Sequence, residues 1–283
     1  MKTDTIKGPL AETWGILRTE FMDLLKGVLK IELLCLFIVL VSLIAAAAAV
    51  IALNGISVIA SVLAGAVILI AGLAGAGIVN SVNYNFVESV VNKRKMIFPD
   101  TVRGNALPFI KYVLFTMLLS LVIMGPIAAV FIFVILSAYG SDQSGLTVTF
   151  VQLIFRLVIT IVGAIYGLFA QFAIFEVLLS RRGVIDGFRQ SLGIVRKNFY
   201  ETVIFSVILW AVESAIAIPV IVLLVLLVFG GLLGGVALGS SSFLLWIAIG
   251  ITALVLIVIL SAVNLVVGIT TKYRFWMRVK KSF

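Results

Sequence analysis

The sequence predicts an all-α fold, a polytopic membrane helix bundle with six transmembrane helices and amphipathic interfacial helices on the cytoplasmic side. Three observations support this prediction. The 283-residue chain is 63% hydrophobic and 12% charged, with a mean hydropathy of +1.30, whereas a soluble domain is nearer half apolar and a quarter charged. Six apolar runs are each long enough to cross a bilayer. The basic residues are sorted into alternate connections between those runs.

The six apolar runs are predicted to be transmembrane helices, because about twenty apolar residues in helical form span the hydrocarbon core of a bilayer. They cover approximately residues 31–53, 56–80, 112–138, 150–180, 201–229 and 243–269. Only Leu53, Asn54 and Gly55 join the first two runs, and an Asn-Gly pair accepts the backbone of a tight turn. These two runs therefore form a helical hairpin, and residues 1–283 are expected to make a single integral membrane domain.

Positive charge is sorted to one side of the predicted bundle. Twenty of the 21 Lys and Arg residues fall into four clusters, which cover residues 2–30, 93–111, 181–197 and 272–281. With six spans, all four clusters lie on one face, and the loops on the other face (residues 54–55, 139–149 and 230–242) contain no Lys or Arg. The positive-inside rule then places both termini in the cytoplasm of a multi-pass protein of the cell membrane.

The sorted basic residues also predict the partners of the chain. A net charge of +9 and a pI near 9.9 can indicate nucleic-acid binding. Here the basic residues border the apolar spans, where each contributes about 1 kcal/mol of attraction to an anionic leaflet. We therefore expect membrane lipids of the anionic inner leaflet as partners, and no nucleic acid.

Residues 183–200 form a charged, helix-patterned insert between the fourth and fifth spans. Its apolar residues recur three or four positions apart, as on one face of an α-helix. This apolar stripe is Val184, Phe188, Leu192, Val195 and Phe199. The basic residues that fall largely off the stripe are Arg189, Arg196 and Lys197. Because the insert is too polar to span, it is predicted to lie in the interface, with its stripe in the acyl chains and its basic residues toward phosphates.

Residues 8–28 repeat this pattern ahead of the first span. Pro9 suits a first helical turn, and apolar residues again recur three or four positions apart. They are Leu10, Trp14, Leu17, Phe21, Leu24 and Val28, with Arg18 among the basic residues between them. Residues 15–18 match residues 193–196 closely, and each segment precedes a hairpin. The sequence thus indicates repeated units of interfacial helix plus hairpin, although any interfacial helix would show similar spacing.

The stretch "IDGFRQSLGIVRKNFYETVIFSVI" at residues 185–208 carries a family resemblance. Its features are an acidic residue, a Ser-Leu pair, a basic residue and Asn-Phe ahead of an apolar run. Here they are Asp186, Ser191-Leu192, Arg196 and Asn198-Phe199. The stretch resembles the segment before the fifth span in six-span membrane proteins of the glycerophosphodiester-phosphodiesterase membrane-domain and UPF0259-like groups. The resemblance implies a six-span architecture with cytoplasmic connectors and no particular reaction.

Polar residues within the spans are candidates for function, because ionisable groups at membrane depth are costly. Glu213 lies about thirteen residues into the fifth span, roughly 20 Å from its cytoplasmic end. Pro219 follows and removes one helical hydrogen bond, so the carboxyl group could bind a cation or a proton there. In the alternative, structural interpretation, Glu213 is hydrogen-bonded across the bundle to Asn264, Ser261 or Gln171. Glu213, Asn264 and Gln171 form the candidate intramembrane polar site.

Two further segments have a predicted contact surface. Span 56–80 is rich in small residues at four-residue spacing, which allow helix backbones to approach closely in lipid. Packing within the chain is the simplest use of this face, and contact with a second copy or another membrane protein is the alternative. The basic tail at residues 270–283 interleaves aromatic residues, including Trp276, with Lys and Arg. It is predicted to be an interfacial anchor, or else the ordinary flank of a span.

No enzyme signature is present in the sequence, which contains no His and one Cys. Without His, the commonest metal ligand and general base are missing, and no catalytic residue, metal or cofactor is predicted. We expect a non-enzymatic integral membrane protein, a scaffold or accessory subunit that acts at the cytoplasmic leaflet through its amphipathic helices. The alternative is a small-solute or lipid transporter with a site near Glu213.

Overall fold

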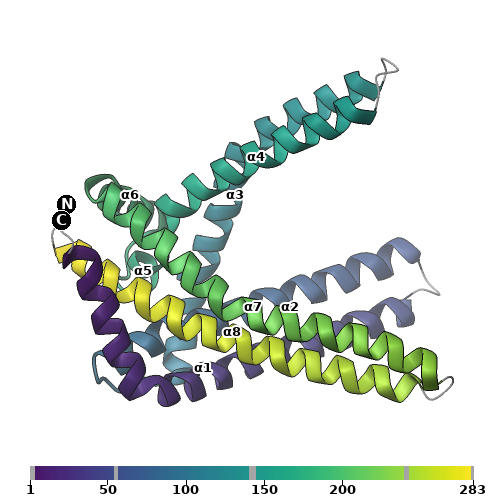
Figure 1. Ribbon diagram of the computed structural model, residues 1–283, viewed down its shortest axis with the longest axis horizontal. Helices are drawn as coiled ribbons and strands as arrows, with labels where there is room; N and C mark the ends of the chain where they lie inside the picture. Colours follow the sequence, from purple (N-terminus) through teal and green to yellow (C-terminus); the bar gives the residue numbers. More distant parts are fainter. Residues whose placement is uncertain (1–3, 54–56, 140–144, 239–241, 282–283) are drawn as a thin grey trace. The chain divides into compact units, whose positions relative to one another are not determined.

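The computed structural model describes residues 4–53, 57–139, 145–238 and 242–281 (Figure 1). Its helices are α1 (Asp4–Leu53), α2 (Val58–Val91), α3 (Phe98–Tyr139), α4 (Gly145–Ala170), α5 (Ala173–Leu178), α6 (Val184–Lys197), α7 (Phe199–Leu238) and α8 (Ser242–Lys281). Within these ranges there is no strand. Six candidate spans are long and apolar enough to cross a membrane, which confirms the predicted all-α class and the number of spans.

Close contacts divide the chain into two compact units. The first comprises Met1–Ala106 and Val203–Phe283, and the second comprises Leu107–Thr202. The first unit contains α1, α2, the first turns of α3, most of α7, and α8. The second contains the rest of α3 together with α4, α5 and α6. The single membrane domain over residues 1–283 stays a prediction.

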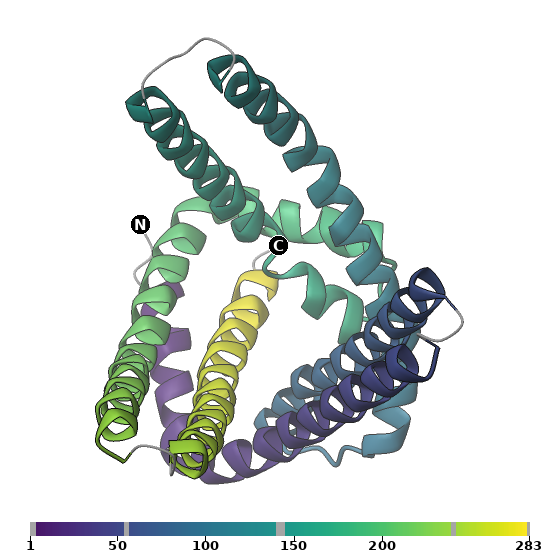
Figure 2. The same cartoon turned by 90° about the vertical axis from the view of Figure 1, so that its right-hand side faces the viewer.

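Several helices are longer than the spans predicted within them. The predicted interfacial segment 8–28 and the first span form one continuous helix, α1, of 50 residues. Figures 1 and 2 show that the N-terminal part of α1 runs in a different direction from the part that pairs with α2. The predicted tail is helical as far as Lys281, at the end of the 40-residue α8. Forty helical residues are roughly 60 Å long, about twice the hydrocarbon thickness of a bilayer.

The α1–α2 hairpin is held by close backbone approach. The predicted turn at Asn54 and Gly55 lies outside the described residues, and α2 begins directly after it with Ser57 as its N-cap. The Ala60 amide donates to Ser57 Oγ at 3.4 Å, as the open N-terminus of a helix requires. The buried small residues of α2 are Ser61, Gly65, Gly72 and Ala76. At Gly65 a Cβ would meet Val50 Cγ2 of α1 at 2.8 Å.

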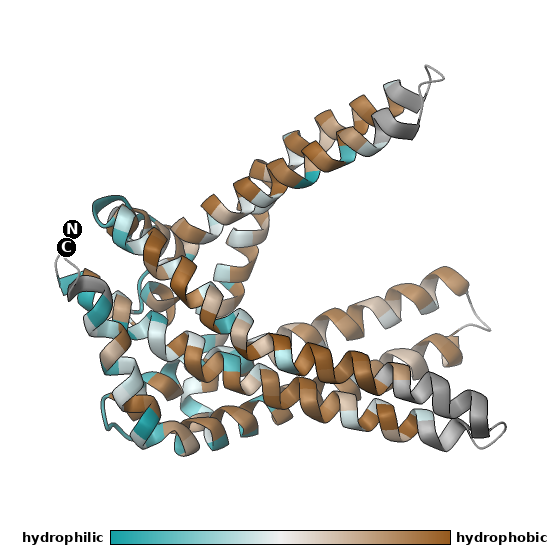
Figure 3. Ribbon diagram, in the orientation of Figure 1, coloured by the Kyte–Doolittle hydropathy of each residue, from teal (hydrophilic) through white to brown (hydrophobic). Residues whose placement is uncertain are grey.

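In the first unit the buried apolar side chains gather toward one end of the helices. Apart from Ala46 of α1, they lie in the first 35 residues of α1, the second half of α2, the start of α7 and the second half of α8. Examples are Leu24, Val28, Val82, Val87, Phe205, Val266, Phe275 and Val279. In contrast, no more than 22% of the most apolar window of any span is buried. Figure 3 shows hydrophilic residues at the N-terminal part of α1 and the C-terminal end of α8.

In the second unit, α5 and α6 close one end of the α3–α4 hairpin. Ala170, Ala173 and Phe188 form a buried cluster, with Tyr112 and Phe115 of α3 packed against it. Further along, α3 and α4 meet through side chains such as Phe131 and Phe155, whose ring centroids are 3.6 Å apart. This arrangement leaves a groove between the two helices, described below.

Candidate functional site

Helix α6 is amphipathic, but the face that it buries differs from the predicted stripe. Its buried residues are Gly187, Phe188, Ser191, Ile194 and Val195. Of the predicted stripe, only Phe188 and Val195 are in this set, while Leu192 is 46% exposed and Phe199 is 43% exposed. Phe188 packs against Tyr112 and Phe115 at centroid distances of 5.8 and 4.9 Å. The prediction that Phe188 faces lipid is therefore wrong for this structure.

Small residues explain why α6 turns this face inward. A Cβ at Gly187 would lie 2.8 Å from Val177 Cγ2 of α5, so only glycine permits this approach. Ser191 Oγ donates a hydrogen bond to the Phe169 carbonyl near the end of α4. A helix leaves its last carbonyls without intrahelical partners, and Ser191 supplies one. The search for large apolar residues in the sequence missed both positions.

The opposite face of α6 presents basic and apolar side chains together. Arg189, Leu192, Arg196 and Lys197 are all exposed, as they were expected to be. Neither Arg189 nor Arg196 forms an ion pair with any of the described residues. Both arginines line a hollow of about 640 Å³ beside Phe169.

An ion pair between a buried carboxylate and a partly exposed arginine lies beside α6 in the second unit. Glu176 of α5 is fully buried, and its Oε2 lies 3.3 Å from Arg182 Nε. The Arg182 amide also donates to the Glu176 carbonyl at 3.1 Å. This burial was not predicted, because Glu176 falls at the predicted end of a span, where a carboxylate can also face headgroups. The pair orders the connection from α5 to α6.

In the first unit, Glu213 of α7 pairs with Lys272 of α8. Glu213 Oε1 lies 3.6 Å from Lys272 Nζ, and both side chains are about one-third exposed. A Cβ at Gly268 would lie 2.7 Å from the same Glu213 oxygen, so glycine makes room for the carboxylate. Helix α7 continues through Pro219. The charge of Glu213 is therefore balanced by a basic residue of the predicted tail.

Ser261 and Asn264, two of the predicted partners of Glu213, lie in the same unit as Glu213. Ser261 Oγ donates to Glu32 Oε2 at 3.4 Å. Asn264 Oδ1 is buried and has no hydrogen-bond partner among the described residues. Gln171 belongs to the second unit, in the turn between α4 and α5. The candidate site of Glu213, Asn264 and Gln171 stays a prediction.

A polar cluster that the sequence did not reveal joins three helices of the first unit. Asn83 Nδ2 of α2 donates to Glu32 Oε1 of α1 at 3.2 Å, and Ser261 of α8 donates to the second Glu32 oxygen. Asn83 also donates to Asn80 Oδ1 at 3.3 Å and is fully buried. Polar hydrogen bonds between helices add to packing in apolar surroundings, so this cluster fixes α1, α2 and α8 together.

The predicted basic tail is packed inside the first unit. Trp276 is 3% exposed, and Phe275 stacks on Phe205 of α7 at a centroid distance of 3.9 Å. Asn92 Nδ2 donates to the hydroxyl of the buried Tyr273 at 2.9 Å. The prediction that Trp276 faces lipid is therefore wrong for this structure, because its ring is covered by protein.

The N-terminal part of α1 packs against this segment of α8. Glu12 lies between Arg274 and Arg278, with nitrogen–oxygen distances of 3.7 and 3.8 Å. On the outer side of α1, Trp14 is 72% exposed and Arg18 is also exposed. These two residues are thus available to a membrane surface or a partner.

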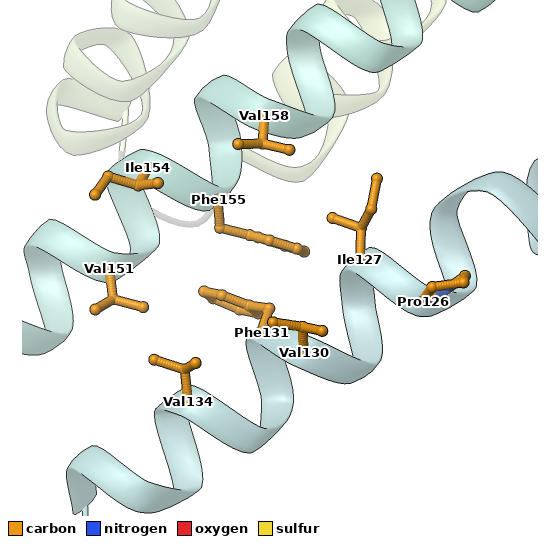
Figure 4. Close-up of a pocket in the computed structure, with 9 residues that line it drawn as sticks. All are labelled: Pro126, Ile127, Val130, Phe131, Val134, Val151, Ile154, Phe155 and Val158. Atoms are coloured by element: carbon orange, nitrogen blue, oxygen red, sulfur yellow. The ribbon is translucent and has the colours of Figure 1, made fainter.

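An apolar groove runs between α3 and α4 in the second unit (Figure 4). Its volume is about 520 Å³. Its lining is Pro126, Ile127, Val130, Phe131, Val134, Val151, Ile154, Phe155 and Val158. Every lining side chain is apolar, so the groove offers no ligand for an ion and no donor for a sugar or an amino acid.

The described residues offer no metal centre. No group of three or more His, Cys, Asp or Glu residues among them could hold a metal ion. Cys35 is buried, and its Sγ lies 3.3 Å from the Ala76 carbonyl, so its thiol is engaged in helix packing.

Comparisons with known proteins give one family. No curated protein and no solved structure matches the chain. The likeness to the glycerophosphodiester-phosphodiesterase membrane-domain and UPF0259-like groups stays a prediction. A model of a family of unknown function, DUF7544, matches residues 25–278. The match covers all six candidate spans in whole or in large part. The chain belongs to the DUF7544 family.

Proposed function

We propose that this multi-pass protein is a non-enzymatic scaffold or accessory subunit that acts at the cytoplasmic leaflet of the cell membrane, with both termini in the cytoplasm. The observation that carries this proposal is the gathering of buried side chains at the helix ends that bear Lys and Arg. Helices of roughly 60 Å exceed the bilayer core by about 30 Å. The surplus length, held by packing and ion pairs, would form a rigid platform on the cytoplasmic side.

The interfacial role of α6 is assigned to its exposed face. Ile185 is 63% exposed and Leu192 is 46% exposed. Arg189 and Arg196 are exposed on the same face of α6 as these two apolar residues. Mixed basic and apolar side chains suit the level of lipid headgroups. This face, rather than the predicted stripe, would meet the anionic inner leaflet.

The N-terminal part of α1 would meet the same leaflet. Trp14, Arg18 and Met22 are exposed and follow one another at four-residue spacing, which puts them in one row along the helix. A tryptophan at headgroup level and an arginine toward phosphate form an interfacial pair.

The partners of the platform are lipids and, through α2, another membrane protein or a second copy. The buried small residues of α2 already pack within the chain, so such a contact would use its opposite face. Leu63, Val67 and Ile70 on that face are 60%, 65% and 66% exposed. Nucleic acid is not a proposed partner, because the basic residues border apolar spans.

Transport by a site near Glu213 is less well supported. A cation bound there would compete with Lys272, which already neutralises the carboxylate. Lys272 belongs to a basic cluster predicted to be cytoplasmic, which favours a position of Glu213 nearer that side than the 20 Å suggested by counting residues.

Cysteine labelling tests the orientation. Cys35 is replaced by Ala, and single cysteines are introduced in place of Gln143 and Lys197. A membrane-impermeant maleimide added to intact cells is expected to label Q143C, and to label K197C only after permeabilisation. Labelling of K197C in intact cells would contradict the proposed topology.

Site-specific photo-cross-linking tests the scaffold role. A photoreactive residue at Val67, which is 65% exposed on α2, is expected to yield an adduct with a defined membrane protein or a second copy. Leu114, which is 55% exposed on α3, serves as the matched control and should yield no such adduct. Absence of an adduct at Val67, together with solute or lipid flux in proteoliposomes that is lost in Glu213→Gln, would overturn the scaffold proposal in favour of transport.

A further inference from the structure

Two hollows of the second unit adjoin each other beside α6. The larger, of about 640 Å³, contains Arg189 and Arg196 in its lining. The smaller, of about 230 Å³, lies between α3, α4 and α6. Phe169 and Leu192 line both of them, so a basic hollow continues into an apolar one.

The basic hollow has the chemistry of a phosphate site. Arg189 and Arg196 are two helical turns apart, about 10 Å along the axis, on the same face of α6. Both are exposed, and neither is paired with a carboxylate of the described residues. A guanidinium presents several donors in a planar fork that matches phosphate oxygens.

The apolar hollow leads away from the arginines along the spans. It is lined by Leu119 and Ile123 of α3 and by Val162 and Ile165 of α4. The apolar hollow extends along α4 from Phe169 to Val162. These residues are seven positions apart, about 10 Å along the helix axis, and Val162 lies toward the predicted membrane interior. An acyl chain that starts beside Leu192 would follow this path without meeting a charge.

One polar group lies between the two regions. The ring of Tyr166 lines the apolar hollow, and its hydroxyl is buried with no hydrogen-bond partner among the described residues. Tyr166 is one turn from Phe169, which lines both hollows. A glycerolipid carries its ester carbonyls between the phosphate and the acyl chains, and such a carbonyl would accept the hydrogen bond that the hydroxyl lacks.

We propose that this site holds one phospholipid with an anionic headgroup. Its phosphate would lie between Arg189 and Arg196, an ester carbonyl at Tyr166, and an acyl chain between Ile123 and Ile165. This inference rests on the proposed function and deepens it, since it names a single lipid as the ligand of the α6 face.

Native mass spectrometry of the full chain tests the site. The protein is released from micelles that contain equal amounts of phosphatidylglycerol and phosphatidylcholine with identical acyl chains. Retained phosphatidylglycerol is expected to exceed retained phosphatidylcholine by about tenfold, which corresponds to about 1.4 kcal/mol. In the R189Q/R196Q variant, the ratio should fall close to one.

The control variant is K95Q/R103Q, which removes the same two charges from exposed positions outside the two hollows. It should keep the ratio of the unmodified chain. Equal retention of the two lipids, an unchanged ratio in R189Q/R196Q, or an equal fall in the control would each overturn the proposal. If R189Q/R196Q loses its helical circular dichroism, the single variants R189Q and R196Q are measured instead, and an unchanged ratio in both has the same meaning.

Two further arms separate a lipid from a free phosphate. Ile165→Trp, at a residue that is 52% exposed, should fill the chain path and lower total lipid retention. The matched variant Ile161→Trp, at a residue that is 51% exposed and outside the path, should not. Displacement of the lipid by glycerol phosphate, or unchanged retention in Ile165→Trp, would overturn the acyl-chain assignment. These measurements use micelles, so their failure is distinct from a failure of the topology labelling.

Discussion

Gly72→Ala is expected to separate α1 from α2, because Gly72 faces the side chain of Ser42 on α1. A Cβ at this position would overlap the side chain of Ser42 on α1. Ser42 Oγ is hydrogen-bonded to the Ile38 carbonyl at 2.7 Å, which holds the side chain in the interface. One added methyl group must therefore displace Ser42 or push the helices apart.

Two opposing effects set the size of this destabilisation. Overpacking of a close-packed contact costs about 1–3 kcal/mol. Replacing a helical glycine by alanine returns about 0.5–1 kcal/mol, because the unfolded chain loses freedom. The net loss in the free energy of unfolding for Gly72→Ala is therefore roughly 0–2.5 kcal/mol, centred near 1 kcal/mol. Equilibrium unfolding in mixed micelles, followed by far-ultraviolet circular dichroism, measures this difference.

Two matched variants make the reasoning refutable. At Gly75, three residues further along α2, a Cβ would meet only Ile38 Cγ2 at an ordinary 3.7 Å, so Gly75→Ala should be neutral or stabilising. Ser42→Gly removes the obstructing side chain, so S42G/G72A should be about as stable as S42G alone. Equal effects of the two alanine variants, or no recovery in the double variant, would show that Ser42 does not limit the approach of the helices.

Three further predictions concern the packed helix ends. Phe205→Ala removes a fully buried ring and should lower the free energy of unfolding by about 3–5 kcal/mol, measured by the same unfolding assay; a loss below about 1 kcal/mol would contradict the packed platform. Arg182→Gln removes one ion-pair partner of the buried Glu176 carboxylate and should lower the free energy of unfolding by about 1–3 kcal/mol, seen as a lower midpoint of thermal aggregation; a loss below about 0.5 kcal/mol, as for an exposed pair, would contradict this reasoning. Glu213→Gln breaks a one-third-exposed pair with Lys272 and should cost about 0.2–1 kcal/mol, with no added loss when Lys272→Gln is combined; additive losses in a double-mutant cycle would show that the two groups do not interact.

Hydropathy predicted the number of spans well, because hydrocarbon requires long apolar helices. It predicted the ends of the helices poorly, because the length of an apolar run matches the thickness of the bilayer core, whereas the helix can continue beyond that run. Residues 270–281 continue α8, and their buried residues include Tyr273, Trp276 and Val279, three positions apart. The spacing used for residues 8–28 would have revealed this buried face had it been applied to the tail.

The α6 face shows a second limit of pattern reasoning. Large apolar residues mark an amphipathic helix, but which of them is buried depends on how closely the backbone can approach its neighbour. Gly187 and Ser191 set that approach, and small residues add little to an apolar pattern. Arg189 and Arg196 are exposed on either assignment, and their place at the lipid headgroups stays a prediction.

Counting along helices could not identify the partner of Glu213. The count considered only polar residues within the predicted spans, which were Ser261, Asn264 and Gln171. Lys272 was assigned to the cytoplasmic flank and so was not considered. Lys272 lies close to Glu213 on α8, which remains helical beyond the predicted span. Counting residues to estimate depth in the bilayer does not reveal where a helix ends.

Glu12 forms ion pairs with Arg274 and Arg278. These pairs join the N-terminal turns of α1 to the C-terminal turns of α8. A ribosome adds roughly 5–20 residues per second, so α1 must wait roughly ten seconds or more for α8 to emerge. During translation, the surface of α1 that α8 later covers faces solvent or a chaperone. Nonsense mutations that remove only the final helix should therefore yield an inserted chain that quality-control proteases recognise at its beginning.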